Sequence, residues 1–158
     1  MTNLFGHTIC QQTFIAVSPD RVYDTITSAA HWNRFFTNST ELDPKPGGKM
    51  VFRWKDWGPN LYTVNAECNI LICERPNRFV FQWYPVGKEN PTTIEFKLEA
   101  KYNGSVVTVT ESGYPDTPEG RKMILECACG WGEATTLLKF YLEHGVIYTP
   151  PQKSGDTT

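Results

Sequence analysis

The sequence lacks any block of charge of one sign and any apolar run long enough to span a bilayer. Its 15 lysine and arginine residues nearly balance its 17 aspartate and glutamate residues, for a formal net charge of −2. Proteins that bind nucleic acid or a membrane by charge need clustered basic residues, so we expect neither partner. Because residues 1–7 also lack the basic and apolar segments of a secretory signal, we expect a cytoplasmic protein.

The five cysteines follow neither a disulfide framework nor the spacing of a zinc site. Free thiols are the expectation for a reducing compartment. Cys127 and Cys129 would point about 200° apart on a helix, so we interpret them as small packing residues and not as a redox pair. No phosphate-binding glycine loop and no cluster of metal ligands is recognisable. We therefore expect no metal and no cofactor.

Aromatic side chains are what the chain has in excess, at 13% of its residues with five tryptophans. Its 158 residues suffice for one domain with a sizeable core. Alternation of apolar and polar residues predicts strands over 11–17, 49–54, 62–70, 79–83, 94–102 and 106–110. Segment 37–48, with its prolines and glycines, is predicted to be a loop. Short turns between the strands, such as Asn103-Gly104, indicate an antiparallel sheet.

Helix-start signals occur at Ser18 and Thr117, each a capping residue followed by proline. They predict a first helix from residue 19 to about 28 and a long one over 118–144, with a second short helix over 29–36. An apolar stripe along the long helix, from Ile124 through Trp131 to Leu142, predicts that it packs on the sheet. We interpret its Gly-Trp-Gly segment, 130–132, as allowing close approach of helix and sheet.

Five segments add a more specific pattern, in this order along the chain. They are Ala16 to Tyr23, Pro46-Gly47-Gly48-Lys49, Glu74 to Trp83, Asn103 to Tyr114, and Gly130-Trp131 with Leu138 and Leu142. Together they resemble the SRPBCC superfamily of START-like, birch-allergen-like proteins. Within it they resemble the branch of homologues of the activator of heat-shock-protein ATPase.

This resemblance implies an α+β helix-grip fold. In that fold a curved antiparallel sheet of about six strands wraps around a long C-terminal helix, with two short helices after the first strand and a cavity between sheet and helix. We expect an N-terminal arm over 1–10, the START-like domain over 11–146 and a disordered tail over 147–158. The fold hosts many activities, so it implies no single one.

Large side chains of the inward strand face and of the helix stripe are candidates to line the cavity. Plain core packing would explain most of them, whereas the excess of aromatic rings favours a ligand site. The candidates are Met50, Phe52, Trp54, Phe81, Trp83, Val109, Trp131, Leu138 and Tyr141.

Glu111 is the most informative polar residue, because it continues the inward row of its strand after Val109. A buried carboxylate is costly unless it is paired, protonated or hydrated. It is predicted to be a polar anchor at the pocket mouth or a general base, with Tyr114 beside it. The alternative is a strand end that reaches solvent or pairs with Arg53 or Arg121.

Binding of a small hydrophobic or aromatic ligand is the function that we predict. The resemblance leaves two alternatives, a polyketide-cyclase-like or hydrolase-like enzyme with Glu111 as its acid–base residue, and a stress-related adaptor similar to a co-chaperone. On the long helix Phe140 lies opposite Trp131, and an exposed aromatic residue there is compatible with a homodimer.

Overall fold

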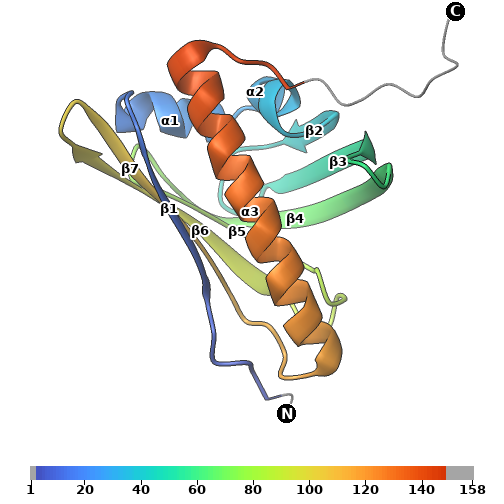
Figure 1. Cartoon of the computed structure of the whole chain (residues 1–158). Coiled ribbons are helices and arrows are strands. Elements are labelled where there is room, and N and C mark those ends of the chain that lie inside the picture. Colours follow the sequence, from blue (N-terminus) through green and yellow to red (C-terminus); the bar gives the residue numbers. More distant parts are fainter. Residues whose placement is uncertain (1–2, 149–158) are drawn as a thin grey trace, which may run out of the picture.

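The computed structural model describes residues 3–148 and contains one sheet with a long helix lying across one of its faces (Figure 1). In chain order the elements are β1 (Ile9–Ile15), α1 (Pro19–Ile26), α2 (Ala29–Phe35), β2 (Ser39–Leu42), β3 (Lys49–Trp57), β4 (Tyr62–Glu74), β5 (Arg78–Trp83), β6 (Thr92–Lys101), β7 (Gly104–Ser112) and α3 (Pro118–His144). This arrangement confirms the predicted helix-grip α+β fold.

The sheet is antiparallel throughout, with the strand order β1-β7-β6-β5-β4-β3-β2. Strands β2 to β7 form a meander, and β1 joins at the far edge beside β7. The sheet has seven strands, one more than the six that were predicted. The additional strand is β2, which lies in the segment that was predicted to be a loop. Its four residues are too few to show a period of two, and its pairing with β3 places Thr40 opposite Phe52.

The inner face of the sheet and the apolar stripe of α3 form the core. One row of paired residues crosses five strands and consists of Ile70, Phe81, Ile94, Glu111 and Ile9. All five side chains are buried. Glu111 therefore lies within an apolar row and not at a strand end in solvent.

Helix α3 begins and ends where the sequence predicts. The Thr117 hydroxyl accepts a hydrogen bond from the Gly120 backbone N–H at 3.0 Å, and Gly145 adopts a left-handed conformation with φ 68° as the C-cap. The helix runs without interruption from Pro118 to His144. Near its C-terminal end the hydroxyl of Tyr141 lies 2.5 Å from Nδ1 of His31, which connects α3 to α2.

Both ends of the described chain pack against the domain. Leu4 forms an isolated bridge with Pro115, and the first strand already begins at Ile9. Residues 149–158 of the predicted tail lie outside the described residues. Tyr148, which is described, packs on Trp57, and the centroids of the two rings are 4.4 Å apart. The predicted domain boundaries stay predictions. Within residues 3–148, no helix has the length and apolar character needed to span a membrane.

Candidate functional site

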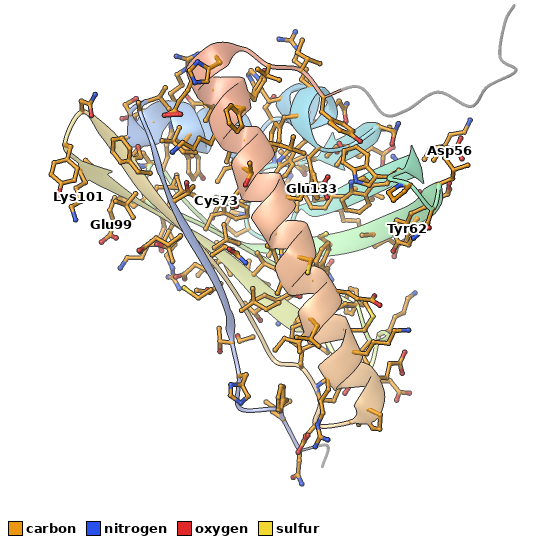
Figure 2. All side chains as sticks on the ribbon, viewed as in Figure 1. Asp56, Tyr62, Cys73, Glu99, Lys101 and Glu133 are labelled. Carbon is orange, nitrogen blue, oxygen red and sulfur yellow. The ribbon has the colours of Figure 1, made fainter. Side chains whose placement is uncertain are left out.

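A cleft of about 680 Å³ opens between the first half of α3 and the adjacent ends of β3, β4 and β5. Figure 2 shows Tyr62 and Asp56 at this end of the molecule and Glu99 and Lys101 at the opposite end. Seven of the 19 residues that line the cleft are aromatic. The rings belong to Phe36, Trp54, Trp57, Tyr62, Trp83, Tyr84 and Trp131.

Helix α3 contributes a second stripe to this cleft, next to the stripe that it buries in the core. Met123, Cys127 and Gly130 follow one another at helical spacing and line the cleft. A Cβ atom at Gly130 would meet nothing within 4 Å. The predicted role of this glycine in close helix–sheet approach is therefore wrong, because Gly130 faces open space. At Gly132 a Cβ atom would make only ordinary contact with Gln11, at 3.6 Å.

Behind the cleft, the carboxylate of Glu111 accepts three hydrogen bonds. Its Oε1 atom accepts from the indole Nε1–H of Trp83 at 2.6 Å and from the hydroxyl of Thr92 at 2.7 Å. Its Oε2 atom accepts from the indole Nε1–H of Trp131 at 2.7 Å. The two indoles come from β5 and α3, so Glu111 connects the sheet to the helix. Such donors offset the cost of burying the carboxylate.

Glu111 is neither a strand end in solvent nor a partner of Arg53 or Arg121. The side chain is 0% exposed, so it does not reach solvent. Arg53 pairs instead with Glu41, at 3.2 Å, and Arg121 with Asp116, at 2.6 Å. Glu111 is also absent from the residues that line the cleft, which places it one layer behind the mouth and not at it.

Two further groups near Glu111 hold their protons firmly. Burial and the neighbouring carboxylate raise the pKa of the Cys127 thiol to about 12, and the same two causes raise the pKa of the Tyr114 hydroxyl. That hydroxyl is buried close to the Cys127 thiol and the Glu111 carboxylate. Because Cys127 stays a neutral thiol at physiological pH, it is a poor nucleophile. All five cysteines are free thiols.

Only some of the residues predicted to bind a ligand line the cleft. Trp54, Trp83 and Trp131 line the cleft, and Tyr114 is buried near Glu111. Tyr141 lies beside His31 toward the other end of α3. The remaining candidates are core residues at most 1% exposed that do not line the cleft, namely Met50, Phe52, Phe81, Val109 and Leu138. Ligand contact by any of these residues stays a prediction.

Sequence reasoning missed the aromatic residues at the cleft rim, above all Trp57. A strict period of two would place Trp57 on the sheet face opposite Trp54. A register shift between these residues, with Asp56 at φ 52°, turns Trp57 toward the cleft instead. Tyr62 and Tyr84 lie at a strand start and just after a strand end, where periodicity is weakest. Only the density of aromatic residues around these turns could have indicated them.

Comparison with protein families gives a match over residues 16–143 to the model described as "Activator of Hsp90 ATPase homolog 1-like protein". The chain belongs to this family. The match covers most of the domain and confirms the resemblance to the SRPBCC branch. Comparison with curated proteins finds no match.

Solved structures similar to this member of the family share its fold. The Aha1 dimer from Colwellia psychrerythraea is 21% identical, with a TM-score of 0.75 over 88% of this chain and 98% of that one. SSP2350 from Staphylococcus saprophyticus is 24% identical, with a TM-score of 0.70 over 92% and 98%. CalU16 from Micromonospora echinospora is 18% identical, with a TM-score of 0.68 over 92% and 85%. At these identities the likeness shows the fold alone.

Proposed function

We propose that the protein binds a small hydrophobic or aromatic ligand in the cleft between α3 and the ends of β3, β4 and β5. The observation that carries the proposal is the ring of aromatic side chains around a volume of about 680 Å³. Pockets for small molecules are typically about 300–1,000 Å³ and mostly apolar, with few polar groups. The cleft has this size and this lining.

Gly130 supports the same proposal from the side of the helix. A glycine inside a helix costs about 1 kcal/mol relative to alanine, and at Gly130 no neighbouring atom requires the missing side chain. The bare backbone at Gly130 leaves a surface without a side chain at one end of the stripe of Met123, Cys127 and Gly130. A planar ligand can lie against that surface, with Trp131 and Cys127 on either side.

The position of Glu111 favours binding over the enzymatic alternative. An acid–base residue must come within hydrogen-bonding distance of the proton that it transfers. Glu111 lies behind the cleft, and its oxygens already accept from Trp83, Thr92 and Trp131. No observation favours the adaptor function, and a cytoplasmic location stays a prediction.

Association of two copies of the chain is proposed as well. The relative from Colwellia psychrerythraea is a dimer, and Phe140 on the outer side of α3 is 46% exposed. An exposed aromatic ring of this kind is compatible with a contact between subunits.

The ligand proposal is tested with 2-naphthylmethanol as a neutral aromatic probe, followed through the indole N–H signals in ¹⁵N-resolved NMR spectra. The signals of Trp54, Trp57, Trp83 and Trp131 should shift as the probe is added. Trp32 is the internal control, because its indole is buried and donates to the Ile26 carbonyl at 2.8 Å. If no cleft signal shifts up to the solubility limit of the probe, the proposal fails.

Gly130→Leu provides the matching variant. The Cβ atom of the new side chain would meet nothing within 4 Å, and the side chain should weaken binding of 2-naphthylmethanol by about tenfold or more, because it occupies space in the cleft. Gly132→Ala is the control on the same helix, since its Cβ atom makes only ordinary contact with Gln11. Equal affinity of Gly130→Leu and wild type would place the binding site elsewhere.

A further inference from the structure

The carboxylate of Glu111 has no positive partner in the described part of the chain. It is 0% exposed and lies in a sheet row between Ile94 and Ile9. The side chains that bond to it, Trp83, Thr92 and Trp131, are neutral donors, and none of the ion pairs within residues 3–148 includes it. Neutral donors stabilise a buried charge without cancelling its field.

Trp83 and Trp131 lie between that charge and the cleft. Their indole N–H groups point back to Glu111, while the same two side chains line the cleft. Their ring centroids are 5.4 Å apart, at an interplanar angle of 38°. Neither ring carries a positive charge, and each N–H lies in the plane of its ring, so the field of the carboxylate extends through this wall toward the cleft. The inner wall of the cleft therefore attracts positive charge.

The charges at the rim of the cleft are also mainly negative. Glu67 lines the rim from β4, and Glu126 and Glu133 line it from α3, opposed by Lys88 from the loop after β5. Glu133 forms no ion pair with a residue of the described chain, and Glu126 lies 3.9 Å from Lys122, at the limit of an ion pair. Figure 2 shows Glu133 on the side of α3 that faces Tyr62. The rim is exposed, so salt screens its contribution more than that of the buried carboxylate.

We propose that the cleft selects a ligand with a positively charged group next to its aromatic or apolar body, and that the cation lies against the wall of Trp83 and Trp131, in front of Glu111. This inference rests on the proposed ligand-binding function and specifies the chemical class of the ligand as an arylalkyl amine. The attraction between such charges is strongest where water is excluded. An anionic ligand would meet a carboxylate behind the wall and three more at the rim.

Three probes of one shape test the selection: 2-naphthylmethylamine, which is protonated at neutral pH, 2-naphthylmethanol, which is neutral, and 2-naphthoate, which is an anion. Their affinities are measured from the indole N–H signals of the wild-type protein. The amine should bind about fivefold more tightly than the alcohol, or more, and the naphthoate should bind most weakly. Alcohol binding as tight as amine binding overturns this inference but leaves the proposed function intact. If none of the three binds, both fail.

Salt separates the buried charge from the rim. At about 0.5 M salt, interactions between exposed charges are largely screened, whereas buried ones are screened much less. A preference for the amine that persists under these conditions supports the role of Glu111 behind the tryptophans. A preference that disappears assigns it to the exposed carboxylates of Glu67, Glu126 and Glu133 and overturns that role.

Two variants complete the test. Glu111→Gln removes the charge in nearly the same shape and should bring the amine and the alcohol to within about twofold of each other. Glu99→Gln is the control, because it removes one exposed carboxylate at the opposite end of the molecule (Figure 2) and should leave the ratio unchanged. If Glu111→Gln folds and keeps the full preference, the inference is wrong. If it does not fold, the wild-type affinities and their salt dependence decide.

Discussion

At the scale of single residues, Glu111 holds the two layers of the molecule together. Its two oxygens accept from Trp83 of β5 and Trp131 of α3, so one side chain orients two rings of the cleft wall. An apolar residue would fit the surrounding row of buried side chains, but it would leave those donors without an acceptor. A buried donor without a partner costs about 1–3 kcal/mol.

Glu111→Leu should therefore lower the free energy of unfolding by about 3 kcal/mol, because the Trp131 indole and the Thr92 hydroxyl would lose their acceptor inside the core. Urea denaturation measures the change. Adding Trp131→Phe to Glu111→Leu removes one of the donors that has lost its acceptor. The loss of unfolding free energy in the double variant should therefore be smaller than the sum of the losses in the two single variants. A Glu111→Leu protein as stable as wild type would contradict the structural role of this network.

At the scale of elements, one face of α3 packs in the core and a neighbouring face borders the cleft. One stripe, including Ile124 and Leu138, is buried and anchors the helix on the sheet. The neighbouring stripe, which includes Gly130, borders the cleft. The glycines of the helix follow this division. Gly120 lies so close to Pro115 that a Cβ atom would overlap its backbone carbonyl, whereas Gly130 has free space.

Alanine substitutions at these two glycines should have opposite effects on stability. Gly130→Ala should raise the free energy of unfolding by up to about 1 kcal/mol, through better helix propensity without a clash. Gly120→Ala should lower it by about 2 kcal/mol, because the Pro115 backbone must move. Thermal or urea unfolding measures both. A loss of stability in Gly130→Ala would mean that its space is not free.

At the scale of the whole molecule, the sheet leaves two edges, β1 and β2, and α3 leaves an outer side that nothing in the described chain covers. The large apolar residues on that outer side are few. Phe140 is 46% exposed and lies toward the C-terminal end of the helix, while Leu125 is 70% exposed in its first half. The proposed homodimer would use the face around Phe140.

Light scattering at several protein concentrations should give the mass of a dimer of the 18.0 kDa chain. Phe140→Asp should shift the protein to the monomer mass, because it places a charge in the proposed contact. Leu125→Asp makes the same chemical change on the same outer side of the helix, about 22 Å from Phe140 along the axis at 1.5 Å per residue, and should leave the dimer intact. A wild-type protein that stays a monomer at every concentration refutes the dimer.

Local patterns in the sequence were sufficient for most of the fold. Alternation along β3 to β7 is a property of neighbouring residues, as are the caps at Ser18 and Thr117 and the apolar stripe of α3. The inward direction of Glu111 also followed from its spacing to Val109. The short strand β2 could not be predicted, because its pairing with β3 is a long-range interaction and its four residues carry no period.

Only the tertiary structure decided what surrounds Glu111 and where the cleft opens. Periodicity assigns a side chain to a face, but it does not say where along the sheet a helix crosses. The meeting of Trp83 and Trp131 at one carboxylate depends on that crossing. The register shift before Trp57 reverses the face that a period of two assigns. The sequence pattern was clearest for the long helix α3, yet only the structure shows that a second face of this helix, at Gly130, borders open space. Open space beside a helix depends on how the layers pack and not on the sequence of the helix alone.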